Sequence, residues 1–414
     1  MARRTAIQSA WIALVLISAG LASVWVIDDS RMRRALMSGR ADLAPGRYQA
    51  FAASMLAEQL FEKGDINAAG AAARQALRTH SGDVPAIRTL ALVAEKQGQF
   101  QQTAGLMAMG ARWSWRDTPT QVWLFAHLTQ EGKFAEAILH GEALAARDEL
   151  PDYIFPAFAA LAAEPAATKS LTAALDRGAN WRSAYYQYMR KAPSQLHPAL
   201  GRLMLAMQKS TASPSQSDVS PLLEAMLDAG NTLEARDLWR KLFWRRAEPM
   251  PAILDGGFDG DSAKAIATNV RSVFGWQFDP SAQLYIVADP AGGNNEVLNI
   301  VSAGSGHGAL AGQRLALEPG AWVLSLRLRS GLPELSSRLR IGIRCSGGGE
   351  WLTEEFREPT RTDSWQVIDL PLTVAVACRS QSLSVEPIGT APGDAVEVWI
   401  DDIAVHRNSG GNSG

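Results

Sequence analysis

The spacing of hydrophobic and polar positions changes twice along the chain. An uncharged apolar run extends from Ala10 to Ile27 and can be stretched back to Ala6. From about residue 46 to 248, apolar and small residues follow the spacing of amphipathic helices. Beyond Pro251 short apolar segments alternate with glycine-rich turns, which predicts β-strands. We therefore expect a multidomain fold, helical first and β second.

The apolar run predicts a membrane segment. Its length lies at the lower edge of a membrane-spanning helix and exceeds the usual apolar core of a cleaved signal. Gly20 and Ala22 fit a cleavage site, but the apolar run continues beyond them to Ile27. We expect residues 1–30 to be a retained anchor with one transmembrane helix; a cleaved signal and a buried soluble helix are the alternatives. Arginines stand on both sides of the run, so their count sets no orientation.

The helical region contains a repeat of 34 residues. Gly64, Gly98 and Gly132 are spaced at this interval, and Gly230 marks a fourth, isolated copy. Each of the first three glycines is followed two positions later by an apolar residue. A glycine at a helix–helix turn adopts a left-handed conformation at little cost. The pattern predicts helical hairpins, with a degenerate helical stretch at about 150–208.

This repeat resembles the tetratricopeptide repeat (TPR) family, whose unit is a helix–turn–helix of 34 residues. In the family a small residue lies seven positions before the turn glycine, and Ala57 and Ala91 match it, whereas Phe125 departs from it. The departure predicts looser packing in the third repeat. The resemblance implies an α-solenoid over residues 46–248 whose concave face binds a protein partner. A generic helical bundle is the alternative.

The last part of the chain predicts an antiparallel β-sandwich over residues 251–408, followed by a disordered tail at 409–414. In the segment WVLSLRLRS, Trp322 and Leu324 share one strand face with the later leucines, and the two arginines lie on the other face. A polar stretch at residues 209–220 reads as a loop or hinge within the helical part.

The order of segments in this region resembles the carbohydrate-binding-module family with a galactose-binding-like jelly roll. The matching segments are DGGFDG at 255–260, FGW at 274–276, residues 313–329, SWQVIDLPL at 364–372 and VWIDDIAV at 398–405. In this family the first and last strands lie side by side and often share a structural calcium ion. Asp259 and Asp401 match those acidic positions, so the resemblance implies a possible calcium site. Ordinary water-facing aspartates are the alternative.

Aromatic side chains are the candidates for sugar binding, because they stack on pyranose rings in such modules. Trp351 follows a glycine-rich loop and is the leading candidate, with Trp276 and Tyr285 as further ligand-binding candidates. Trp322 and Trp365 lie in segments that pack in the core of the family, so we expect both to be buried. An ordinary surface tryptophan is the alternative for Trp351.

The two cysteines lie in this same region. Cys345 and Cys378 each end an apolar stretch and are 33 residues apart. Neighbouring strands would bring them together as a disulfide, and such a bond would fit an exported β-sandwich. Two buried free thiols are the alternative.

Composition and charge narrow the functional classes. The chain has 414 residues, of which 47% are hydrophobic. Its formal net charge of -2 gives it no overall electrostatic attraction to nucleic acid. The six histidines are scattered, the glycine clusters lack the residues of a phosphate loop, and adjacent carboxylates such as Asp401 and Asp402 point to opposite strand faces. We expect a binding protein with no cofactor other than calcium, and not an enzyme.

These features together suggest a location and a role. We expect a bacterial inner-membrane protein with a single pass and most of its chain in the periplasm. The repeats would recruit a protein partner and the sandwich would contact a polysaccharide, in an accessory role in exopolysaccharide or envelope-glycan assembly. The main alternative is a periplasmic TPR factor for protein assembly, secretion or cytochrome maturation that has no sugar ligand.

Overall fold

A computed structural model gives the fold of the chain. It describes residues 26–34, 37–38, 40, 48–178, 180–260, 262, 266, 272–291, 295–302, 308–330, 339–347, 349–354, 364–388 and 396–408. The chain divides into two compact units, Met1–Ile154 and Phe155–Gly414. We describe each unit by itself. The second unit contains both helices and strands, so the change from helix to strand near residue 250 lies within it.

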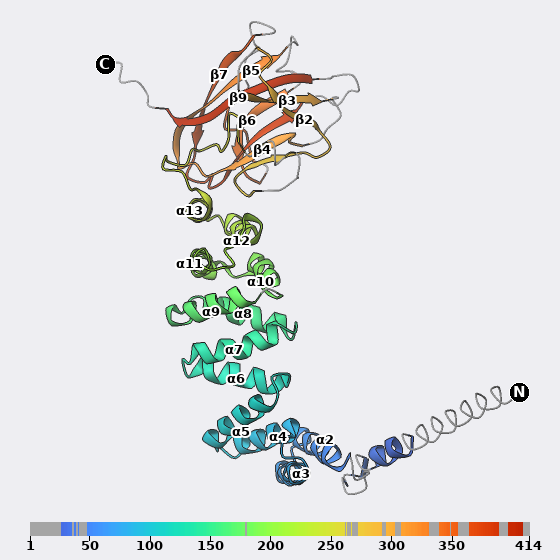
Figure 1. The fold of residues 1–414 in the computed structure, drawn as a ribbon. Helices are drawn as coiled ribbons and strands as arrows, with labels where there is room; N and C mark the ends of the chain where they lie inside the picture. The colour runs from blue at the N-terminus through green and yellow to red at the C-terminus, as the bar shows by residue number, and fades with distance from the viewer. Residues whose placement is uncertain are drawn as a thin grey trace, which may run out of the picture. The chain divides into compact units, whose positions relative to one another are not determined.

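Consecutive helices form antiparallel hairpins in the first unit (Figure 1). Its helices are α2 (Gln49–Glu62), α3 (Ile66–Thr79), α4 (Val84–Lys96), α5 (Phe100–Trp113), α6 (Thr118–Gln130) and α7 (Phe134–Ala145), and α8 (Pro151–Leu161) crosses into the second unit. The remaining helices belong to the second unit: α9 (Pro165–Arg177), α10 (Arg182–Tyr188), η3 (Met189–Lys191), η4 (Ser194–Leu196), α11 (His197–Met207), α12 (Gln216–Asp228) and α13 (Thr232–Phe243).

All four glycines of the repeat pattern occupy helix–helix turns. Gly64, Gly98, Gly132 and Gly230 have φ values of +83°, +75°, +72° and +78°. A β-carbon at this φ would crowd the following carbonyl, so the turn favours glycine. They join α2 to α3, α4 to α5, α6 to α7 and α12 to α13, which confirms the predicted helical hairpins.

The repeat also appears in the contacts between hairpins. Ser54 Oγ donates to Asp83 Oδ1 at 2.8 Å, and one repeat later Arg88 pairs with Asp117. Both aspartates cap the next hairpin, because Asp83 accepts from the Ala86 amide and Asp117 accepts from the Thr120 amide. At both junctions one aspartate therefore starts a helix and also bonds to the preceding hairpin.

Phe125 occupies the position where the other repeats have alanine. Ala57 and Ala91 are fully buried, and Phe125 is buried as well, with its ring edge-on to Tyr153 at 6.2 Å between centroids. A large side chain is thus accommodated in the core of the third hairpin.

Two antiparallel sheets make up the rest of the second unit (Figure 1). The four-stranded sheet has the order β1 (Trp276–Phe278), β4 (Ala311–Leu315), β8 (Gln381–Pro387) and β6 (Leu339–Cys345). The five-stranded sheet has the order β2 (Gln283–Ala288), β3 (Glu296–Ser302), β9 (Val396–Arg407), β5 (Gly320–Ser330) and β7 (Gln366–Val374).

One hydrophobic core lies between the sheets. Leu324, Leu326 and Leu328 of β5 contribute to it from the five-stranded sheet, and Ile341 and Ile343 of β6 contribute from the other. The alternation of β5 predicted from the sequence is confirmed, since its leucines are buried and its arginines are not. The fold is therefore helical hairpins followed by an antiparallel β-sandwich.

Two expectations concern residues at the ends of the chain. Within the described part of the chain, no helix combines the length and the apolar character needed to cross a membrane. Residues 1–25 of the expected anchor at 1–30 lie outside the described residues, as does the expected tail at 409–414.

Candidate functional site: a polar groove on the four-stranded sheet

A groove of about 410 Å³ lies on the outer face of the four-stranded sheet. Its floor is formed by small residues of the two central strands, Gly312 on β4 and Ser382 and Ser384 on β8. Arg314 and Arg344 line it as well, as do the following residues from the remaining strand and loops: Gln277, Phe278, Asp279, Pro280 and Ala309. Its volume is in the range of small-molecule sites, and its lining is mostly polar.

Strand register explains why these side chains meet. Arg314 of β4 is the cross-strand partner of Ser382 of β8, and Ser382 is the partner of Arg344 of β6. Residues one position away along each strand, such as Leu383 and Ile343, point into the core. A single serine thus lies between two arginines across three neighbouring strands.

Trp351 lies on the same outer face, beside the groove. Its backbone forms an isolated antiparallel β-bridge with Arg344. The guanidinium carbons of Arg340 and Arg344 lie 4.5 Å and 5.2 Å from the centroid of its ring. A β-carbon placed on Gly342 would collide with the Thr353 hydroxyl and lie 3.0 Å from the ring, so glycine makes room for both side chains. Trp351 is half-buried and packed onto the sheet, and its ring lies beside the polar groove.

The other two aromatic candidates lie elsewhere. Trp276 is only 4% exposed; its indole nitrogen donates to the Asp255 carbonyl at 3.0 Å, and its ring packs on Phe258. A ring buried to this extent cannot stack on a sugar, which corrects the expectation for Trp276. Tyr285 is 50% exposed, but it lies on β2 of the five-stranded sheet. The three predicted aromatic residues therefore do not form one site.

Trp322 and Trp365 are half-buried, whereas we expected both in the core. The Arg407 guanidinium lies over Trp322 at 4.7 Å, and the Arg327 guanidinium lies over Trp365 at 4.9 Å. Both indoles also donate hydrogen bonds, to the Glu318 carbonyl and to Asp289. Trp322 nevertheless packs against the hydrophobic core from β5, which lies between β9 and β7.

The expected calcium ligands come close together. The carboxylates of Asp259, Asp401 and Asp402 all approach Gly257, whose β-carbon would lie 3.4–3.9 Å from one oxygen of each. The opening segment, rather than β1, lies along the last strand, because Ile403 donates its amide to Gly256 at 2.9 Å.

The oxygens of these carboxylates already have partners. Arg327 pairs with Asp401 and, at 2.7 Å, with Asp402. Asp401 also accepts from Asn295 at 3.0 Å, and Asp259 accepts from the Glu296 amide at 2.9 Å. Burial raises the pKa of the Asp401 carboxyl, against the opposite effects of the Asp402 amide and Arg327.

A calcium ion fits this arrangement poorly. A guanidinium stands between two of the carboxylates that the ion would need, and like charges repel. Across the described ranges, no group of three or more acidic, histidine or cysteine side chains is arranged to hold a metal ion.

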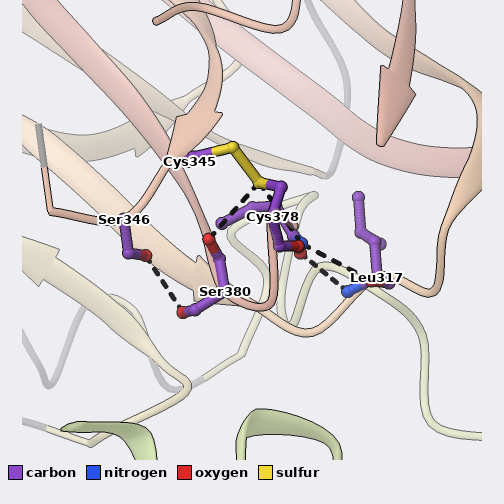
Figure 2. Close-up of a disulfide and its surroundings, with 6 residues drawn as sticks. Leu317, Cys345, Ser346, Cys378 and Ser380 are labelled. Carbon is purple, nitrogen blue, oxygen red and sulfur yellow. Dashed lines mark hydrogen bonds between the residues drawn. A yellow bond between two sulfur atoms is a disulfide. The ribbon is translucent and has the colours of Figure 1, made fainter. Parts of the chain in front are cut away.

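Cys345 and Cys378 form a disulfide between the end of β6 and the segment before β8 (Figure 2). Hydrogen bonds on either side hold the same two segments: Ser346 and Ser380 share a bond of 3.0 Å, and Gln381 donates to the Cys378 carbonyl at 2.6 Å. Figure 2 shows Ser346 and Ser380 beside the two cysteines. The crosslink fixes β6 beside β8 at the end of the sheet that carries Ser382 and Arg344.

Sequence reasoning did not find the groove. Its signal is the alternation in LRIGIRC and QSLSV, which places Arg340, Gly342 and Arg344 on one face and Ser382 and Ser384 on one face. That both faces belong to one surface follows only from the pairing of β6 with β8.

Comparisons with known proteins add little to this site. No family model matches the sequence, and no curated protein matches it. Among solved structures, PilF of Pseudomonas aeruginosa is 11% identical, covering 49% of this chain and 96% of that chain with a TM-score of 0.27. TmCBM61 in complex with β-1,4-galactotriose is 16% identical, covering 39% and 100%, with a TM-score of 0.25.

A Clostridium thermocellum endo-1,4-β-D-xylanase 10B, solved as CBM22-1 and GH10 modules with xylohexaose, is 14% identical. It covers 34% of this chain with a TM-score of 0.24, and this chain spans 27% of its length. At such TM-scores none of these likenesses carries an argument about function.

Proposed function

We propose that this protein is a membrane-anchored binding protein whose β-sandwich contacts a glycan through the groove on its four-stranded sheet. The groove is the observation that carries the proposal. Its floor of Gly312, Ser382 and Ser384 leaves room for a ring, and its walls present amide, hydroxyl and guanidinium groups that hydrogen-bond to sugar hydroxyls. The disulfide and the strand ladders hold these groups on a rigid surface.

The helical hairpins would bind a protein partner. Support comes from large apolar side chains on the surface of the first unit, where Phe100 is 67% exposed, Trp113 62% and Trp115 50%. Exposed aromatic side chains are frequent anchors of protein interfaces. An accessory role in exopolysaccharide or envelope-glycan assembly would use both surfaces, the hairpins for the assembly partner and the groove for the polymer.

The location belongs to the same proposal. The apolar run from Ala10 to Ile27 would hold the chain in a bacterial inner membrane, with the remainder in the periplasm, where a disulfide persists. Carbonate washing of membranes tests the anchor, with Leu16→Arg as the variant that should release the protein. Full-length protein in the wash of the unmodified chain contradicts the anchor, and a mass shortened by cleavage near Ala22 supports the signal alternative.

Glycan binding by the full-length protein tests the central part of the proposal. We expect a polysaccharide panel to contain at least one ligand, and Ser382→Trp to abolish its binding by filling the groove. Val367→Trp is the matched control, because Val367 is 67% exposed on β7 of the other sheet. Equal binding by Ser382→Trp and the unmodified protein contradicts the groove as the site.

A second candidate function is a periplasmic assembly, secretion or cytochrome-maturation factor without a sugar ligand. The exposed Trp113 and Trp115 favour it, because they offer a protein-binding surface that needs no contribution from the sandwich. This candidate predicts that partner binding is lost in Trp113→Ser with Trp115→Ser and is unchanged in Ser382→Trp. No member of the glycan panel would then bind.

A further inference from the structure

One arginine of the groove, Arg314, has no partner among the described residues. Arg314 is half-buried on β4, and among the residues that the structure describes it makes no ion pair, side-chain hydrogen bond or ring contact. Two other half-buried arginines of the sandwich have carboxylate partners: Arg344 contacts Glu386 at 2.6 Å, and Arg327 contacts Asp401 and Asp402. A third, Arg329, lies over the Trp399 ring at 5.7 Å. A partly desolvated guanidinium without a counter-charge favours an anionic ligand.

The acidic groups nearby do not neutralise Arg314. Glu386 of β8 forms an ion pair with Arg344 of β6, the neighbour of β8 on the side away from β4 and Arg314. Asp279 lines the opposite end of the groove, where it donates its amide to the Leu310 carbonyl at 2.8 Å. Leu310 is four residues from Arg314, or about 13 Å along the strand.

The Asp279 carboxylate is also occupied. The Ser281 amide and hydroxyl donate to it at 2.9 Å and 2.7 Å, and these two bonds lower the pKa of Asp279. The groove therefore has a basic end at Arg314, Ser382 and Arg344, and an end where the one acidic group is already hydrogen-bonded.

We infer that the groove takes a glycan that carries carboxylates, with a uronate carboxylate placed at Arg314 beside the Ser382 hydroxyl. This inference rests on the proposed function and names its substrate class. A guanidinium binds a planar carboxylate through two parallel N–H bonds, and a hydroxyl adds a third donor. Gln277, further along the groove, suits the neutral hydroxyls of the neighbouring sugar.

The test compares each acidic oligosaccharide with its own carboxyl-reduced form, which has the same backbone and linkage. Probes are oligogalacturonate, oligomannuronate, oligoguluronate and hyaluronan fragments, measured by calorimetry on the full-length protein. We expect at least one acidic form to bind about tenfold or more tightly than its reduced form. This preference should shrink as ionic strength rises, because salt screens the charge.

Arg314→Gln should remove the preference and leave the affinity for the reduced form unchanged. Arg245→Gln is the matched control. Arg245 is an exposed residue that follows α13, and its substitution removes the same charge at a position outside the groove. Folding of both variants is checked by their melting temperatures.

Three results would overturn the inference. If reduced forms bind as tightly as acidic ones and Ser382→Trp still blocks them, the carboxylate assignment is wrong and the proposed function stands. If Arg245→Gln loses as much affinity as Arg314→Gln, the effect is one of overall charge and Arg314 has no special role. If none of these probes binds but a neutral glycan of the polysaccharide panel does, and Ser382→Trp blocks it, the inference is wrong and the proposed function stands; if no member of either set binds, both are wrong.

Discussion

Arg327 on β5 and Asp401 on β9 form an ion pair across neighbouring strands of the five-stranded sheet. The Asp401 side chain is 1% exposed, and Arg327 also reaches Asp402 and stacks on Trp365. This guanidinium supplies the positive charge at a position where the family resemblance implies calcium. Arg327 therefore joins the last strand to its neighbour through an ion pair.

Removal of Arg327 should destabilise the sandwich strongly. In Arg327→Met a buried carboxylate loses its counter-charge, at a cost of about 3 kcal/mol. Arg407 is a matched control, because it also lies over a tryptophan and pairs with Glu318, but both partners are more than half exposed. Arg407→Met should cost less than about 1 kcal/mol. Thermal unfolding of both variants checks the difference, and equal melting temperatures would contradict a special role for Arg327.

Calcium should have little effect on the unmodified protein. With Arg327 between Asp401 and Asp402, we expect the same melting curve in calcium and in chelator. Bound calcium at 100 times its dissociation constant would instead stabilise the fold by about 2.7 kcal/mol and raise the melting temperature by several degrees. Such a rise, lost in Asp259→Ala, would restore the calcium site that the sequence suggested.

Alanine substitutions at two glycines of the hairpins should change the free energy of unfolding in opposite directions. Gly98→Ala places a side chain at a φ of +75° and should destabilise the first unit by about 1 kcal/mol. Gly105 lies exposed within α5 with open space around its missing β-carbon. Gly105→Ala should therefore stabilise the unit by about 0.5–1 kcal/mol. Urea unfolding followed by helical circular dichroism measures both, and shifts of the same sign would refute the conformational explanation.

The disulfide should make a measurable contribution to stability. It closes a loop over a separation of 33 residues, which corresponds to about 3–4 kcal/mol in the chain-entropy model. The double variant Cys345→Ala with Cys378→Ala should lose stability of this order. Alkylation without reductant, followed by mass spectrometry, should label neither cysteine in protein from the periplasm. Labelling of both thiols would show that the bond is absent there.

Patterns that depend on local conformation were readable from the sequence. The turn glycines could be predicted, because each turn needs a positive φ. The alternation of β5 could also be predicted, because a strand exposes every second residue. The burial of Trp276 could not be predicted from the sequence. This burial depends on the Asp255 carbonyl and the Phe258 ring, which the opening segment brings to the sheet.

The groove depends on contacts between distant parts of the chain. Arg314, Arg344 and Ser382 are far apart in sequence, and only the strand order β4–β8–β6 brings them together. Trp351 was a reasonable candidate for exposure, but the two arginines and Gly342 that hold its ring are visible only in the folded sheet.

Hydroxyl-radical footprinting with a bound polysaccharide tests the central claim most directly. Trp351 and Phe278 report on the face with the groove, and Tyr285 on the other sheet corrects for radicals that the sugar consumes. The account predicts that oxidation of Phe278 and Trp351 falls relative to Tyr285 when the polymer is bound. Protection of Tyr285 with unchanged Phe278 and Trp351 would place the glycan on the five-stranded sheet and contradict the account.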